Sequence, residues 1–317
     1  MQEEIMIEKY SPAKKEKWNE FLGRAKNPLF MFHRDYMEYH NDRFTDHSLM
    51  FYRKGELTAL FPANEKDDML QSHGGLTCGG LIVDTKFRQH TADDCMCGLL
   101  EYANREGFKS VLYKTIPHIY HLQPAEEDVY ALYRQGAELV YVSASTVIDL
   151  RTPVKMTKGR KAQISRAKRE GVVVKQLSTK EGYKAFMGLE NDVLEARHGT
   201  KAVHTADEMY LLYTRFPEQI HLLGAFLGEE LIAGTILFEY DRAVHTQYMA
   251  AGSVAREIGA LDLVIATAIE RYAMSKQWFD FGTSTEGDGT YLNEGLISQK
   301  EGFGGRTNVY AQWKIMV

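Results

Sequence analysis

The sequence predicts an α/β protein of two domains, with mixed sheets that carry helices on both faces. Three observations predict this class. The chain has 317 residues, enough for about two domains of ordinary size. Its 44% hydrophobic, 26% charged and 11% aromatic residues are typical of a globular protein. Both halves also show one order of hydrophobic patterns: strand, helix, helix, three strands, helix, strand, helix, strand.

In the first half, alternating and helical hydrophobic patterns follow one another and are separated by glycine and proline. Ser11-Pro12 is typical of a helix N-terminus, because proline is tolerated at the first helical position. Gly107 and Gly136 end two further helices. The expected strands are 5–10, 48–53, 56–62, 70–77, 110–115 and 138–150. One expected helix begins at residue 12, and three others span 33–40, 92–105 and 126–134.

The second half repeats this order. We expect strands at 172–177, 220–227, 230–240, 244–250, 278–281 and 307–316, and helices at 180–196, 206–215, 260–275 and 293–300. Gly55 and Gly228 open matching turns 173 residues apart (228 − 55), and Phe108 and Trp278 open matching strands 170 apart (278 − 108). This near-constant offset indicates a duplication. Pro153 interrupts the pattern, so we expect domains at 1–150 and 151–317, with the active site in the second.

The overall composition excludes several classes of protein. A net charge of −5 does not indicate a nucleic-acid or membrane-surface protein, and the chain has no apolar run near the roughly 18 residues of a membrane span. Three cysteines suit a reducing compartment, so we expect a cytoplasmic protein. Cys95 and Cys97 would point about 200° apart on a helix, so no metal site is expected.

The densest chemical signal lies between residues 277 and 305. Asp280 stands between two phenylalanines in a short strand, where aspartate is disfavoured unless it caps a turn or serves a site. A glycine-rich loop, 282–290, follows it and could line a ligand crevice. Lys300 is expected in the last turn of a helix, where it either complements the helix dipole or stabilises an oxyanion or phosphate.

Two further segments could bind anions. Arg256, Gly259 and Ala260 join a strand to the start of an apolar helix, where backbone N–H groups and a close-approaching glycine could hold a pyrophosphate. Between 155 and 169 the chain carries seven cations and no acid, at Lys155, Lys158, Arg160, Lys161, Arg166, Lys168 and Arg169. This run is either a solvated surface or a site for RNA, a nucleotide-linked sugar or a phosphorylated lipid.

These motifs resemble the closing signature of FemAB-type proteins. The resemblance rests on Phe279-Asp280-Phe281-Gly282, on the loop that follows, and on the run from Gly295 to Gly304 with Gln299-Lys300 at its centre. The basic helix, Arg197-His198-Gly199, 74–76 and 145–150 are also similar to that group, so the resemblance spans nearly the whole chain. It implies tandem domains of the GNAT superfamily of N-acyltransferases.

The resemblance leaves two acyl donors open. In coenzyme A enzymes the pyrophosphate loop reads R/Q-x-x-G-x-G/A, and Arg256 and Gly259 match it, whereas Leu261 takes the last small position. The peptidoglycan-bridge enzymes of the family use aminoacyl-tRNA instead. They usually have Phe-Lys where this chain has Gln299-Lys300. The chain departs from both patterns, so both donors stay open; acyl-coenzyme A is the expected co-substrate, with no covalently bound cofactor, and aminoacyl-tRNA is the alternative partner.

The resemblance also implies roles for residues in the transfer of an acyl group to an amine. Glu239 and Asp280 are the candidate proton acceptors, Tyr248 or Tyr291 could protonate the leaving group, and Lys300 could stabilise negative charge. Substrate-binding cations would be Lys158, Arg160, Lys161 and Arg166.

The sequence thus predicts an N-acyltransferase that moves an acyl group from acyl-coenzyme A to a small-molecule or peptide amine. One alternative is an aminoacyl-tRNA-dependent transferase acting on a cell-wall peptide precursor. An alternative of another class is a non-catalytic GNAT-fold module that holds an anionic nucleotide or glycan precursor.

Overall fold

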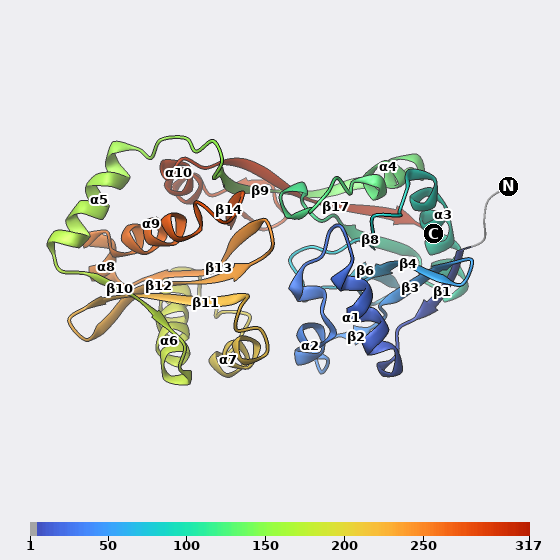
Figure 1. The fold of residues 1–317 in the computed structure, drawn as a ribbon, viewed down its shortest axis with the longest axis horizontal. Coiled ribbons are helices and arrows are strands. Elements are labelled where there is room, and N and C mark those ends of the chain that lie inside the picture. The colour runs from blue at the N-terminus through green and yellow to red at the C-terminus, as the bar shows by residue number, and fades with distance from the viewer. Residues whose placement is uncertain (1–4) are drawn as a thin grey trace. The chain divides into compact units, whose positions relative to one another are not determined.

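A computed structural model describes residues 5–317 and divides the chain into two compact units (Figure 1). The first unit contains residues up to 144 together with 286–291 and 309–317, and the second contains 145–285 and 292–308. The sequence-based bounds at residue 150 differ from this division and stay a prediction. Among residues 5–317, no helix is long and apolar enough to cross a membrane.

The first unit contains two groups of strands. One sheet has the order β1 (Ile5–Lys9), β3 (Leu49–Arg53), β4 (Glu56–Phe61) and β7 (Ile82–Val83). The other group runs β17 (Arg306–Met316), β8 (Ser110–Lys114), β6 (Met69–Ser72), β5 (Ala63–Lys66) and β2 (Thr45–Asp46), with β6 and β8 parallel. The helices are α1 (Lys15–Gly23), α2 (Arg34–Met37), α3 (Gln89–Arg105) and α4 (Glu127–Arg134).

The second unit is built on the sheet β10 (Val173–Leu177), β11 (Ile220–Leu227), β12 (Glu230–Glu239), β13 (Ala243–Ala251), β14 (Trp278–Thr283) and the end of β9 (Glu138–Asp149). Its helices are α5 (Lys158–Arg169), α6 (Lys180–His198), α7 (Ala206–Arg215), α8 (Ser253–Ile258), α9 (Ala260–Tyr272) and α10 (Glu294–Gly302). The short strands β15 (Thr285–Glu286) and β16 (Tyr291–Leu292) pair with each other.

Helices cover both faces of the second sheet. Figure 1 shows α9 and α5 on one side of β11–β13, and α6 and α7 on the other. The apolar face of α9 supplies buried Leu263, Val264 and Ala268 to the core. On the other side Tyr183 and Phe186 of α6 are fully buried. Burial of these two apolar faces against one sheet stabilises the unit.

Strands β13 and β14 separate after a short parallel pairing. They pair only through Ala243–His245 and Trp278–Asp280, and β13 then continues to Ala251 without β14 beside it. The backbone of the outer half of β13 is therefore unpaired on that side. A gap between two parallel strands of this kind is a natural place for a ligand.

Each unit is completed by a strand from the other half of the sequence. In the second unit, Ser145–Asp149 of β9 pairs antiparallel with β14. In the first unit, Gln312–Met316 of β17 pairs antiparallel with β8. The duplicated strand order is thus accompanied by an exchange of final strands, which the hydrophobic pattern did not predict.

Several elements differ from the sequence prediction. The strand expected at 56–62 ends at Phe61, and β5 starts at Ala63, because Pro62 has no N–H for a sheet ladder. The piece expected at 70–77 is shorter, and helix α8 precedes α9 although no separate helix was predicted there. The three cysteines are free, and the described residues contain no cluster suited to a metal ion.

Candidate active site

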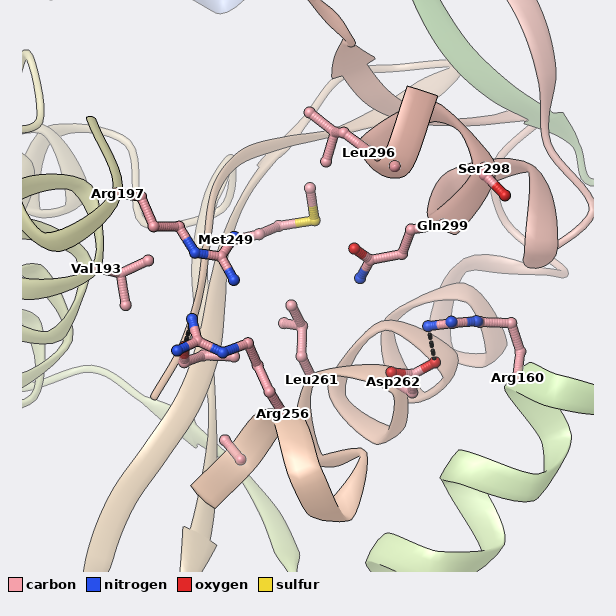
Figure 2. Close-up of a pocket in the computed structure, with 13 residues that line it drawn as sticks. Arg160, Val193, Arg197, Met249, Arg256, Leu261, Asp262, Leu296, Ser298 and Gln299 are labelled. Atoms are coloured by element: carbon pink, nitrogen blue, oxygen red, sulfur yellow. Dashed lines mark hydrogen bonds and ion pairs between the residues drawn. The ribbon is translucent and has the colours of Figure 1, made fainter. Parts of the chain in front are cut away.

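A cavity of about 400 Å³ lies within the second unit, beside the unpaired part of β13. Its walls come from α5, α6, β13, α8, the first turn of α9, and α10 (Figure 2). The lining residues are Arg160, Val193, Arg197, Met249, Ala251, Ala255, Arg256, Leu261, Asp262, Gly295, Leu296, Ser298 and Gln299.

Three arginines from three different helices reach this cavity. Figure 2 shows Arg197 and Arg256 directed toward each other, with Arg160 on the opposite side. Arg160 pairs with Asp262 at 2.6 Å, and Arg256 donates to the carbonyl of Ala251 at 3.2 Å. Three guanidinium groups against one carboxylate make the cavity positive, so it suits an anionic ligand.

Asp262 is the acid among the cavity's lining residues. Burial raises its pKa, and the Arg160 guanidinium acts in the opposite direction. Protonation of Asp262 would leave the cavity with a larger positive charge, whereas ionisation retains the pair with Arg160. The cavity is therefore positive in both states.

The predicted pyrophosphate segment is only partly at the cavity wall. Arg256 lines it, whereas Gly259 and Ala260 shape the turn from α8 into α9. Gly259 has φ +76°, and a Cβ there would lie 2.6 Å from the carbonyl oxygen of Gln163 on α5. Ala260 is fully buried. The turn and the close approach of α5 therefore require glycine at position 259 whether or not a ligand binds there.

Of the four predicted substrate-binding cations, one reaches the cavity. Arg160 is half-buried and also packs over the ring of Phe303 at 5.9 Å. Lys158, Lys161 and Arg166 are exposed on α5. The structure therefore divides the basic run into one cavity residue and a solvated helix face.

Asp280 is fully buried in a hydrogen-bond network at the point where β13 and β14 separate. It accepts from the hydroxyl of Ser145 and from the backbone N–H of Gly282 at 2.9 Å, and its other oxygen meets His245 Nδ1 at 2.9 Å. This arrangement holds the His245 ring at the start of the gap between the strands.

Lys300 lies near Asp280 but binds the backbone. Its Nζ donates to the carbonyls of Gly282 and Thr283 at 2.9 and 2.6 Å, and its side chain is buried. Burial lowers the pKa of Lys300 to about 8, while the charge of Asp280 opposes that shift. Lys300 therefore joins α10 to the end of β14, and the cavity is lined instead by Gln299 before it.

Glu239 lies outside the cavity, at the other end of the sheet. It pairs with Val244, whereas the cavity contacts Met249 and Ala251, roughly 17–23 Å further along β13 at about 3.3 Å per residue. Glu239 is ion-paired with Lys276 at 2.8 Å and meets His221 at 3.1 Å. Although burial acts in the opposite direction, these partners lower its pKa to about 2.

The two tyrosines differ in environment. Tyr248 of β13 is half-buried, and burial raises its pKa to about 12. Its hydroxyl meets His204 Nδ1 at 2.6 Å. Tyr291 is 63% exposed on β16. Neither tyrosine is among the residues that line the cavity; Tyr248 precedes Met249, which does line it, and directs its hydroxyl to the segment after α6.

Sequence reasoning assigned no site role to several cavity residues. Arg197 is the most important, because it adds a third guanidinium from α6. It stands two residues before Gly199, which ends α6 in a left-handed conformation. That arginine near a helix end was visible in the sequence, but its approach to Arg256 depends on tertiary packing.

Comparison with known proteins gives one family match, and it covers the part of the chain that forms most of the cavity. A family model described as an acetyltransferase (GNAT) domain matches residues 155–291. No curated protein matches the chain. The matched segment contains all of the cavity's lining residues except those on α10.

Solved structures resemble the whole chain in fold. The crystal structure of FemX is 12% identical with a TM-score of 0.68, covering 98% of this chain and 97% of that one. L-PGS from Bacillus licheniformis is 15% identical (TM-score 0.62; 97% and 93% covered). A tandem GNAT protein from the clavulanic acid biosynthesis pathway is 11% identical (TM-score 0.55; 99% and 98% covered).

These similar structures show the fold, and the predicted mixed α/β architecture with tandem GNAT-like domains is confirmed.

Proposed function

We propose that the protein transfers an acyl group from an acyl-coenzyme A thioester to a primary amine, with the phosphates of the donor in the arginine cavity. The observation that carries this proposal is the convergence of Arg160, Arg197 and Arg256 on one cavity inside the acetyltransferase domain. Guanidinium groups bind phosphate oxygens through paired, charge-assisted hydrogen bonds.

Two backbone features support the same ligand. Leu261 and Asp262 of the cavity lie in the first turn of α9, where the helix dipole and N–H groups favour an anion. Met249 and Ala251 belong to the part of β13 that β14 leaves unpaired. An extended donor arm could bind there as an added strand, through main-chain hydrogen bonds.

The reaction would join the neutral nitrogen of the amine to the carbonyl carbon of the thioester. A proton acceptor must take a proton from the ammonium form of the amine, and a donor must neutralise the leaving thiolate. Tyr248 can serve as that donor, because burial raises the pKa of its hydroxyl to about 12, and the hydroxyl is therefore protonated at neutral pH. Asp280 would position His245, and Lys300 would fix the end of β14.

A second candidate donor is aminoacyl-tRNA. The observation that favours it is the exposed basic face of α5, with Lys158, Lys161 and Arg166 outside the cavity. The similar structures also include FemX and a putative lysylphosphatidylglycerol synthetase. A polynucleotide would contact several exposed cations and show a steep salt dependence.

Calorimetric titration with coenzyme A and with unacylated tRNA would distinguish the donors. Coenzyme A should bind, and Arg256→Gln should weaken it about 10- to 100-fold, since a charged hydrogen bond contributes about 1.5–3 kcal/mol. Arg271→Gln is the matched control, because Arg271 lies in the last turn of α9. Binding of tRNA alone, weakened by joint substitution of Lys158, Lys161 and Arg166, would replace the coenzyme A proposal.

A further inference from the structure

Glu190 is a buried carboxyl group on the inner face of α6. Its exposed fraction is only 6%, and its Oε2 has no hydrogen-bond partner among the described residues. A buried carboxylate without a partner is costly, so it usually indicates a missing cation or a functional role.

The position of Glu190 connects it to the cavity. At about 100° per residue, Glu190, Val193 and Arg197 share one stripe of α6, and the last two line the cavity. Tyr183 and Phe186, further back on the helix, are fully buried. Glu190 is thus the carboxyl that stands between the apolar core and the cavity wall.

Polar groups from other elements meet at the same place. Tyr248 of β13 precedes Met249 of the cavity, and the charge of Glu190 contributes to raising the pKa of that tyrosine. Tyr248 also meets His204, in the segment after α6, and interacts with Glu208 of α7. Burial raises the pKa of Glu190 itself to about 7, near the value at which a general base works best at neutral pH.

Other carboxylates considered for this role have their oxygens engaged. Asp280 accepts from Ser145 and Gly282 and meets His245. Glu239 is held by Lys276 and His221. Glu190 differs from both because its Oε2 is buried and has no hydrogen-bond partner among the described residues.

We infer that Glu190 binds the ammonium group of the acceptor and takes its proton, so that the acceptor is a cationic primary amine. This inference rests on the proposed function. Glu190 accepts one proton and becomes a carboxylic acid. The freed lone pair of nitrogen forms the C–N bond as the C–S bond breaks, and the thiolate takes a second proton from that nitrogen through Tyr248. Solvent then removes the proton from Glu190.

The test compares the wild type with Glu190→Gln, using acetyl-coenzyme A and 1-aminobutane, with 1-butanol as an uncharged match. Wild-type kcat/KM should fall as pH drops below about 7, because the carboxylate becomes protonated. Glu190→Gln should lose this acid limb and react at least 10²-fold more slowly at pH 8. The amine should also raise the wild-type melting temperature at pH 8, whereas 1-butanol should not.

Glu195→Gln is the control, since Glu195 is exposed on the same helix and points about 140° away from Glu190. It should retain the rate and the pH profile of the wild type. An equal response of wild type and Glu190→Gln to the amine, including no response in either, would overturn the inference. Coenzyme A binding is measured in parallel on both proteins, so its absence identifies a failure of the proposed function instead.

Discussion

At the scale of single residues, the burial of Lys300 favours a structural role over the oxyanion role that the sequence motif suggested. Its ammonium group supplies hydrogen bonds to two backbone carbonyls at the end of β14. Lys300→Met would leave those carbonyls unsatisfied, at a cost of about 1–3 kcal/mol each. We therefore expect the melting temperature to fall by several degrees.

Thermal unfolding and turnover of Lys300→Met should be measured together. The exposed Lys168 of α5 provides a control, since Lys168→Met should change stability by less than about 0.5 kcal/mol. An unchanged melting temperature with a 10²- to 10³-fold lower kcat would instead support the oxyanion role suggested by the sequence.

The arginines show how far residue-level prediction can go. Arg256 was predicted because a local spacing pattern links it to Gly259 at a helix start. Arg197 lies in α6 and meets Arg256 only after α6 packs on the sheet, so no local pattern reveals the pair. Glu239 was predicted as a candidate because it ends a strand, but alternation does not reveal which edge of the sheet holds a ligand.

At the scale of elements, the turn between α8 and α9 determines where α5 can lie. Gly259 is left-handed, and its missing side chain leaves room for the backbone of Gln163. Gly259→Ala should therefore destabilise the protein by more than the roughly 1–2 kcal/mol of the left-handed conformation alone. Because α5 carries Arg160, coenzyme A binding should weaken as well.

Urea unfolding of Gly259→Ala can be compared with Gly188→Ala. Gly188 lies within α6 with no heavy atom near its missing Cβ, so alanine there should stabilise by roughly 0.5–1 kcal/mol. Equal stability of the two variants would show that α5 does not need this close approach.

The order of elements was predictable for the second unit because each helix and strand carries its own periodic pattern. The division of one expected strand at Pro62 follows from the missing N–H of proline. The separation of β13 from β14 was not predictable, because a change of partner leaves no period in either strand.

At the scale of the whole molecule, each half of the sequence supplies one strand to the sheet of the other unit. Ser145–Asp149 comes from the first half, yet it pairs with β14 of the second unit. Val147 and Ile148 are buried there, and the Ser145 hydroxyl donates to Asp280. The boundary that the repeat predicts, at residue 150, would assign all of β9 to the first domain, although residues 145–149 of that strand pair with β14 of the second unit.

This exchange predicts a difference between two fragments of the chain. A fragment of residues 151–308 lacks the strand that covers β14, whereas one of residues 144–308 retains it. Burial of Val147 and Ile148 contributes about 1.5–3 kcal/mol for each side chain, so the shorter fragment should be less stable by about 3–6 kcal/mol before hydrogen bonds are counted. Circular dichroism on heating and coenzyme A titration of both fragments would check this. Equal melting temperatures would mean that the sheet of the second unit is complete without β9, and would favour the boundary at residue 150.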